Sequence, residues 1–459
     1  MDAPPSSKAA DEQGSTPRFV TGSTMRHVLV MTGTGTAGLI AIFVVDLVSL
    51  LYISWLNDPS MTAGVGLATV VMFFTISINV GLMIPVGALV SRALGARRAD
   101  DARRLATSCS ILMTAIAAAI SAIVIVMLPV ILKALGAHDR TYDVALSFLW
   151  IALPTNAVMA LGMGLSTVLR AAGDAKRSMY ATLSVAVVTV FLDPILIFGL
   201  DMQSDGAAMT INIARLVTAY VSFRYVTRIH NLLAAPSWSG LLHDTRPFLA
   251  IAVPAILTNI AAPAANAFFT GVVARFGDEI IAASAIIDRV TPVAFAGLFA
   301  LAGAIGPVLG QNWGAHRYDR MKQILKDALT VTVIYVGCVW LILFLVRGPL
   351  TQAFNAPEQT AELVQFFCQL SGLIWLFIGL VLVSNASFNN LGYPLLSTFF
   401  NWGRATLGMI PFAYFGAQVA GPKGALVGIG LGSVAFGIAA VITAFWTIRR
   451  LERQAVPVA

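Results

Sequence analysis

The sequence predicts an all-α integral membrane protein with twelve transmembrane helices, and three observations support this prediction. The first is composition: of the 459 residues, 58% are hydrophobic and 11% are charged, whereas soluble globular domains carry about 25% charged residues. A chain so poor in charge is expected to cross a bilayer many times. The net charge of +7 comes from basic residues that cluster between apolar stretches, so no nucleic-acid partner is expected.

The second observation is the number of apolar stretches. A helix needs about 20 apolar residues to span the hydrocarbon of a bilayer, and twelve stretches are long enough to do so. Several are longer and should tilt or bend. The predicted spans are roughly 28–56, 62–91, 105–133, 144–169, 178–200, 207–227, 248–274, 280–309, 326–347, 361–388, 396–416 and 424–448.

The third observation is the distribution of Lys and Arg. Twelve is an even number, so both ends of the chain lie on one side of the membrane. Most basic residues fall on that side, and three Arg lie within spans. Under the positive-inside rule both termini are cytoplasmic, and a bacterial inner membrane is the expected location. The opposite side holds only Lys133, Arg140, Arg275, Arg347 and Lys423.

The chain also repeats itself at a spacing of about 219 residues. Gly95–Asp100 returns as Gly314–Asp319, and Gly173 returns as Gly392. Such a repeat predicts two six-helix lobes, related by a pseudo-two-fold axis along the membrane normal because six is even. The expected division is a disordered tail at 1–25, an N-terminal lobe at 26–229, a linker at 230–246, a C-terminal lobe at 247–450 and a tail at 451–459.

A carboxylate inside a predicted span is the strongest functional signal. Asp193 directly precedes Pro194 in the apolar run from Tyr180 to Leu200. An ionised Asp near the middle of a span costs roughly 2.5–3.5 kcal/mol, and Pro194 leaves a backbone carbonyl unpaired. Both costs are tolerable where the site faces a water-filled cavity. The alternative interpretation is that Asp193 caps a helix start with Pro194 at its first position.

The two halves differ in their acidic residues. Asp46 lies midway along the first span, where the second half has the neighbourhood of Ala265 and Asn266, and Asp193 corresponds to Ile410. Carboxylates held away from water are candidate proton carriers, so Asp46 and Asp193 are predicted to form a cation-coupling site.

Polar residues in other spans could complete this site or line a substrate cavity. For the coupling-site candidates, ordinary interhelical hydrogen bonding is an equally good interpretation. For adjacent Asp288 and Arg289, a structural ion pair is favoured. For Arg215 and Arg404 the sequence leaves snorkelling and cavity lining open. The coupling-site candidates are Asn156, Thr189 and Thr210, and the cavity candidates are Asn79, Asn259, Asn266, Asp288 and Arg289.

No catalytic or metal chemistry is indicated. Cys109, Cys338 and Cys368 lie in apolar runs without metal-like spacing. The sequence has no metal-binding His/Asp cluster and no nucleophile–base spacing. We therefore expect neither a metal, a cofactor nor an enzymatic activity.

Several short motifs together resemble the multidrug and toxic compound extrusion (MATE) transporters. Leu192–Ile195 with Phe198-Gly199 and Gly206–Ala208 resembles that family's fifth-to-sixth span signature, and Leu169–Asp174 its fourth-loop motif. Asp46 matches the first-span Asp, and Gln311–Ala315 with Asp319-Arg320 resembles the eighth-to-ninth loop. The resemblance covers the chain from about Arg26.

Departures from the family pattern suggest a branch. Where one branch has a seventh-span Glu, this chain has Ala262 beside Pro263, which makes the DinF-like branch the closer match. A fifth-span Asn is Thr189 here, and an early first-span Pro is missing, with Gly33, Gly35 and Gly38 nearby.

The resemblance implies a cation-coupled exporter. The expected function is secondary antiport by alternating access, in which a cationic or lipophilic organic compound leaves as protons enter; sodium is the alternative coupling ion. The alternative function is a flippase for lipid-linked saccharides, which would favour more than three in-span Arg. Small organic substrates and the lipid bilayer are the expected partners, and a monomer is the expected state.

Overall fold

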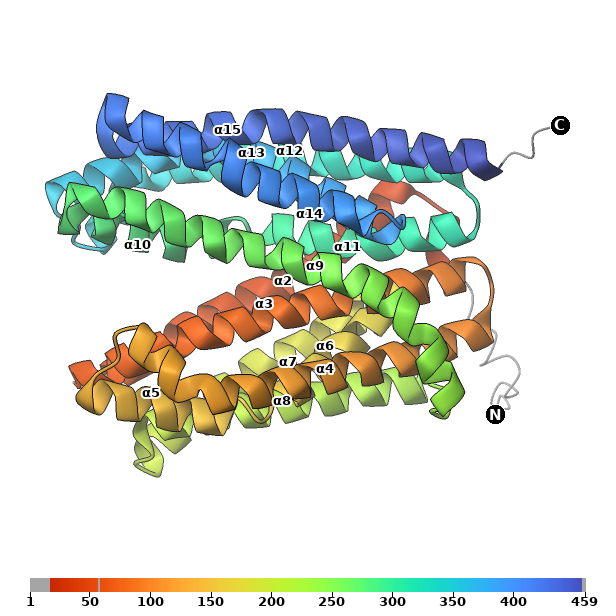
Figure 1. Cartoon of the computed structure of the whole chain (residues 1–459), viewed down its shortest axis with the longest axis horizontal. Coiled ribbons are helices and arrows are strands. Elements are labelled where there is room, and N and C mark those ends of the chain that lie inside the picture. Colours follow the sequence, from red (N-terminus) through yellow and green to blue (C-terminus); the bar gives the residue numbers. More distant parts are fainter. Residues whose placement is uncertain (1–16, 57, 456–459) are drawn as a thin grey trace, which may run out of the picture. The chain divides into compact units, whose positions relative to one another are not determined.

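The computed structural model describes residues 17–56 and 58–455, and all regular structure in these ranges is helical (Figure 1). The elements, in chain order, are η1 (Arg18–Val20), α2 (Thr24–Ser54), α3 (Pro59–Gly95), α4 (Ala99–Ala134), α5 (Asp139–Ala152), α6 (Asn156–Ala171), α7 (Ala175–Pro194), η2 (Ile195–Gly199), α8 (Gln203–Arg228), α9 (Trp238–Val273), η3 (Ala274–Phe276), α10 (Asp278–Ala294), α11 (Ala296–Gly314), α12 (Tyr318–Ala353), α13 (Glu358–Asn390), α14 (Pro394–Gly403), η4 (Arg404–Gly408) and α15 (Ile410–Ala455).

Each predicted span coincides with helical structure. Within the described ranges, seven helical segments are long and apolar enough to cross a membrane, and the bent pairs α5–α6 and α10–α11 raise this to nine. One of the seven, Pro394–Ala455, holds two predicted spans and is broken at Ala420 and Gly421. The two remaining spans are α8 and α9, which complete the predicted twelve.

The bends lie where proline or glycine predicts them. The α5–α6 pair turns by 50° across a break that contains Pro154, and Gly421 takes a left-handed φ of 60° just before Pro422. Proline lacks the N–H that continues a helix, and glycine accepts positive φ without a steric penalty. The first break explains why one span appears as the two helices α5 and α6, and the second separates two predicted spans within α15.

The internal repeat is visible in the backbone. Left-handed residues recur at a constant spacing of 219: Arg97 (φ 57°) and His316 (φ 55°), Gly136 (φ 82°) and Asn355 (φ 45°), Gly173 (φ 82°) and Gly392 (φ 81°). Only the third pair is glycine at both positions, so the turn geometry is kept where the residue type is not. This agreement supports the repeat inferred from the sequence.

The described chain forms two compact units whose boundaries differ from the predicted ones. The first unit contains Ala37–Ile256, and the second contains Phe19–Thr36 and the chain from Leu257 onward. The boundaries therefore fall inside α2 and α9, at nearly equivalent places in the repeat. The predicted boundary at 230–246 is only partly a linker, because α9 begins at Trp238.

The predicted tails also need correction. The expected disordered tail at 1–25 is too long: η1 begins at Arg18 and α2 at Thr24, and Phe19 is 3% exposed. At the other end, α15 continues to Ala455. Residues 1–16 and 456–459 lie outside the described residues.

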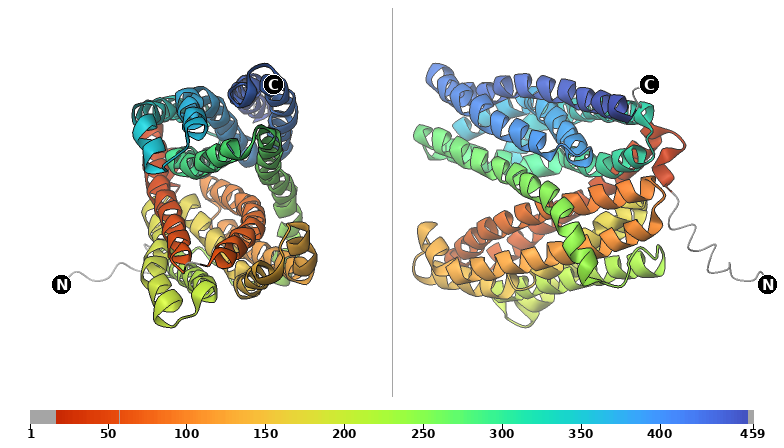
Figure 2. Two further views of the ribbon diagram at one scale, coloured as in Figure 1. Left: turned by 90° about the vertical axis from the view of Figure 1, so that its left-hand side faces the viewer. Right: turned by 45° about the vertical axis from the view of Figure 1, so that its right-hand side comes forward.

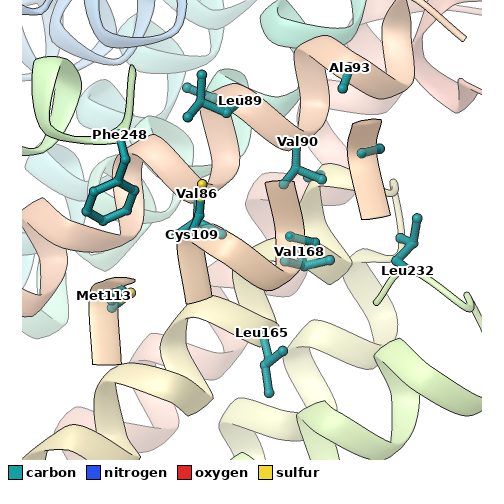
Figure 3. Close-up of a cluster of buried hydrophobic side chains, with 14 of the residues drawn as sticks. Val86, Leu89, Val90, Ala93, Cys109, Met113, Leu165, Val168, Leu232 and Phe248 are labelled. Carbon is teal, nitrogen blue, oxygen red and sulfur yellow. The ribbon is translucent and has the colours of Figure 1, made fainter. Parts of the chain in front are cut away.

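The core of the first unit joins α3, α4 and α6 to the start of α9 (Figure 3). Val86 on α3, Cys109 on α4, Val168 on α6 and Phe248 on α9 are all fully buried in it. Close packing of these apolar side chains fixes the positions of α3 and α6. These two helices carry the candidate residues Asn79 and Asn156.

In the second unit, α12, α13 and α15 lie side by side (Figures 1 and 2). Buried Leu343, Phe367 and Cys368 join the cluster that these helices share with α10 and α11. The long helices thus form a scaffold against which α14 and the second half of α9 can pack.

Candidate functional site

Asp193 lies inside continuous helical structure rather than at a helix start. It precedes Pro194, the last residue of α7, and the π-helical η2 follows without a break. The helix-capping interpretation is therefore wrong. Pro194 cannot donate to the carbonyl of Val190, and a π-helical turn is a common accommodation of such a defect at functional sites.

The Asp193 carboxylate is 1% exposed and is held by hydroxyls from two other helices. Ser49 Oγ on α2 donates to Asp193 Oδ2, and Thr210 on α8 lies close enough to the carboxylate for its hydroxyl to act on it. Thr210 Oγ1 lies 3.1 Å from the carbonyl oxygen of Gly206 as well. A hydroxyl has one proton to donate, so Thr210 can serve only one of these two acceptors at a time.

Asp46 is brought to Asp193, as the sequence predicts. It lies on α2, three residues before Ser49, and is close enough to Asp193 for the two charges to interact. Unlike Asp193, its side chain is exposed. The arrangement therefore pairs an accessible carboxylate with a buried one.

Ser49 is the residue that sequence reasoning missed. The sequence feature that could have identified Ser49 is its spacing of three residues from Asp46, because residues i and i+3 share a helix face. A hydroxyl one turn from a buried carboxylate is a weak pattern, and only the packing of α2 against α7 gives it a partner.

The predicted partners Asn156 and Thr189 are engaged elsewhere. Asn79 Nδ2 donates to Asn156 Oδ1 at 2.8 Å, and Asn156 Nδ2 donates to Ser121 Oγ at 2.9 Å. Thr189 Oγ1 donates to the carbonyl oxygen of Val185 at 2.9 Å. For Asn156, interhelical hydrogen bonding among α3, α4 and α6 is therefore the better interpretation.

The other cavity candidates lie in the second unit and differ in exposure. Asn259 is partly buried, whereas Asn266, Asp288 and Arg289 are exposed. The expected ion pair between Asp288 and Arg289 is absent among the described residues, because adjacent positions on a helix point in different directions.

Arg215, one of the in-span arginines, has a structural role. Its Nη1 donates to the carbonyl oxygen of Ala152 at 2.5 Å and to Thr155 Oγ1 at 2.9 Å. Asn212 Nδ2 donates to the carbonyl oxygen of Ile151 at 2.8 Å. These acceptors flank the α5–α6 break, so α8 satisfies the polar groups that the break exposes.

The fourth-loop motif fastens the loop between α8 and α9. Asp174 accepts hydrogen bonds from the backbone N–H of Arg177 at 3.1 Å and from Arg177 Nη1 at 2.5 Å. His230 Nε2 lies 2.8 Å from Asp174 Oδ2. Burial by itself would raise the pKa of Asp174, but the hydrogen bonds from His230 and Arg177 hold that pKa below its ordinary value. The motif is therefore structural.

The eighth-to-ninth loop motif holds the segment before α2, and we call the set of contacts around residues 19–24 the N-terminal clasp. Gln311 Oε1 accepts from the backbone N–H of Phe19 at 2.9 Å, and Arg320 Nη2 donates to the Phe19 carbonyl oxygen at 2.9 Å. Thr24 Oγ1 donates to Asp327 Oδ2 at 2.5 Å. The sequence singled out the loop motif but not this segment as its partner.

Comparison with known proteins identifies relatives over most of the chain. The family model MatE matches residues 36–195 and 254–415. A FAD transporter of Shewanella oneidensis is 24% identical over 430 residues, covering 90% of this chain and 93% of the relative. The multidrug export protein MepA of Staphylococcus aureus is 26% identical over 359 residues, covering 73% of this chain and 76% of the relative.

Solved structures share the fold. The Vibrio cholerae MATE transporter VcmN superposes with a TM-score of 0.88 at 22% identity, covering 94% of this chain and 97% of that structure. An outward-facing multidrug resistance MATE family transporter gives a TM-score of 0.88 at 19% identity, covering 95% and 98%. The predicted fold class and the resemblance to the MATE family are both confirmed, whereas the DinF-like branch stays a prediction.

Proposed function

Because the chain belongs to the MATE family of multi-pass membrane transporters, we propose that it is a secondary antiporter that exports organic compounds in exchange for protons. The observation that carries the proposal is the pair formed by exposed Asp46 and buried Asp193. A buried carboxylate beside an accessible one can receive a proton from water through its neighbour. On this proposal the chain performs no catalysis and acts as a monomer.

The hydrogen bonds of Asp193 supply a way to accommodate the proton. When ionised, the carboxylate accepts from Ser49 on α2 and from Thr210 on α8. When protonated, it has an O–H of its own to donate. Thr210 can then accept from Asp193 and donate to the Gly206 carbonyl oxygen, 3.1 Å away.

Protonation also weakens the link between α2 and α7. A hydrogen bond to a charged acceptor is roughly twice as strong as one between neutral groups. Neutralising Asp193 therefore loosens Ser49, and with it the part of α2 that belongs to the first unit. A loosened α2 is the conformational step that we propose for alternating access.

Protons suit this site better than sodium. An oxygen cage for sodium would need more ligands, and Asn156, the candidate amide oxygen, is bonded to Asn79. The described residues that interact with the Asp193 carboxylate are Asp46, Ser49 and Thr210. We therefore propose proton coupling, with sodium as the alternative that the experiment tests.

The substrate class follows from weaker arguments. The sequence favours cationic or lipophilic compounds, and MepA is a multidrug export protein. The FAD transporter among the relatives adds a compound that bears phosphates. For direction, the distribution of Lys and Arg places both termini in the cytoplasm of a bacterial inner membrane, so the substrate leaves the cell.

The test is transport in proteoliposomes with an imposed pH or sodium gradient and a panel of fluorescent dyes. A pH gradient should drive efflux by the unmodified protein, whereas a sodium gradient should not. Asp46→Asn and Asp193→Asn should insert normally and lose gradient-driven efflux. Asp278→Asn, which removes an exposed carboxylate in the second unit, is the matched control and should retain it.

Two results would overturn the proposal. Efflux driven by sodium alone would reassign the coupling ion. Normal pH-driven efflux by both single variants would mean that the proton uses neither carboxylate.

A further inference from the structure

Arg404, the first residue of η4, is a charged residue within a span that the proposed function does not use. It continues the face of α14 that carries buried Ser397 and Asn401. The opposite face carries Phe399 and Leu407, which are 63% and 69% exposed. Arg404 therefore points away from the side of the helix that faces lipid, although its side chain keeps partial exposure.

Arg404 is also without a partner in the part of the chain that the structure describes. Its Nε is buried and makes no hydrogen bond, and no ion pair or hydrogen bond joins the guanidinium to another described residue. Arg215, by contrast, is occupied by Ala152 and Thr155. A guanidinium carries five donors, and leaving them unpaired within a membrane is costly.

The surroundings of Arg404 are neutral. Trp402 Nε1 donates to the carbonyl oxygen of Leu257 at 2.9 Å, which holds α14 against the second half of α9. The residue after Arg404, Ala405, belongs to a small apolar cluster with Ala261 of α9. No carboxylate of the described residues neutralises the arginine, so its positive charge is available to a ligand.

We propose that Arg404 is the anion-recognition group of the substrate site, so that the exported compound carries a phosphate or a carboxylate on an organic body. This inference rests on the proposed transport function. The planar guanidinium fork matches the oxygens of either anion in a bidentate geometry. The preference for cationic compounds expected from the sequence then becomes the outcome that the experiment must exclude.

The test compares matched substrates that differ in a single anionic group. Full-length protein in proteoliposomes is given riboflavin and its 5′-phosphate, and a dye with a free carboxylate and its methyl ester. In at least one pair the anionic member should be exported tenfold faster or more. Arg404→Gln should reduce its export to the rate of the uncharged or esterified member and leave the rate of that member unchanged.

Arg275→Gln is the matched control, because it removes an exposed arginine from the same unit and Arg275 is not a cavity candidate. It should keep the preference for the anionic member. Arg404→Lys keeps the positive charge but loses the planar guanidinium that can bind two oxygens. It provides a second test if Arg404→Gln does not insert into the membrane. In the lysine variant the KM for the anionic member should rise severalfold while the KM for its counterpart stays constant.

The outcomes separate this inference from the proposed function. Gradient-driven export that favours the uncharged or esterified member of both pairs overturns the role of Arg404 and leaves antiport standing. An anion preference that survives in Arg404→Gln, or an unchanged KM in Arg404→Lys, also overturns it. Anion export that requires Arg404 but no proton gradient would support the anion site and contradict proton coupling.

Discussion

Ser49 and Thr210 determine what Asp193 can do, because they are the hydrogen-bond donors to a carboxylate that water hardly reaches. A buried carboxylate without donors would be costly in its ionised form. Two hydroxyls from different helices make the ionised form tolerable and also link it to helix position. At the scale of single residues, the proposed coupling site is therefore a buried carboxylate that hydroxyls on other helices stabilise.

Removing the Ser49 donor should impair coupling without unfolding the protein. A hydrogen bond to a charged group contributes about 1.5–3 kcal/mol, so Ser49→Ala should reduce pH-driven efflux about tenfold or more. Ser49→Thr keeps the hydroxyl and is the control. Equal efflux rates for the alanine variant and the unmodified protein in proteoliposomes would show that Ser49 plays no part.

Asp174 should contribute to stability in a pH-dependent manner. Its pKa is depressed in the folded protein, so its contribution is present above the ordinary Asp pKa of about 3.9 and is lost as pH falls below it. Asp174→Asn should lower the melting temperature at pH 7, and the difference from the unmodified protein should shrink at pH 3. Thermal melting in lipid nanodiscs measures both, and a difference that grows at pH 3 would contradict the sign.

At the scale of elements, α2 has two halves with different attachments. Its beginning is held in the second unit by the N-terminal clasp, and its end contacts α7 through Ser49 and Asp193. The same division occurs in α9, between Ile256 and Leu257. A helix attached at both ends can transmit a local change at Asp193 along its length.

Breaking the clasp should release the segment before α2. Arg320 donates to the carbonyl oxygens of Phe19, Thr21 and Gly22, so Arg320→Gln removes one donor from each of them. The Phe19 oxygen keeps Asn312 Nδ2 and the Thr21 oxygen keeps His27 Nε2. Hydrogen exchange of the amides in residues 19–24 should accelerate more than tenfold. Arg317→Gln, which alters an exposed neighbour, should leave exchange unchanged; similar acceleration in both variants would deny the clasp a specific role.

At the scale of the whole molecule, the two halves of the repeat share turns but not chemistry. The π-helical turn follows Pro194 in the first half, whereas it precedes Pro411 in the second. The first half has Asp193 where the second has Ile410. One proton crossing 100 mV and one pH unit releases about 2.3 and 1.4 kcal/mol, which suffices for a several-hundred-fold substrate gradient from a single acidic site.

The orientation of the whole chain can be measured by labelling. Cys338 is the exposed native cysteine among the described residues and is first replaced by serine. Cysteines introduced at Arg140 or Lys423 should then react with an impermeant reagent on intact cells, and those at Arg98 or Arg320 should not. The reverse pattern would invert the direction of transport.

Patterns along the chain were enough to predict most of the fold. Local hydropathy predicts the spans, because every helix that crosses the bilayer needs an apolar stretch of about the same length. Residues that favour turns predict the repeat: Gly173 and Gly392 occupy equivalent positions and share the same left-handed backbone conformation. The sequence also singled out Asp46 and Asp193 as site candidates, because a carboxylate in an apolar run is costly whatever surrounds it.

Only the tertiary structure decided which groups meet. Ser49 and Thr210 reach Asp193, while Asn156 is bonded to Asn79. Arg215 and Arg404 are both arginines within spans, yet Arg215 donates to Ala152 and Thr155 at a helix break and Arg404 has no partner among the described residues. The physical reason is that a hydrogen bond depends on distances of about 3 Å between atoms on different helices. Helix packing sets those distances, and no local pattern records them.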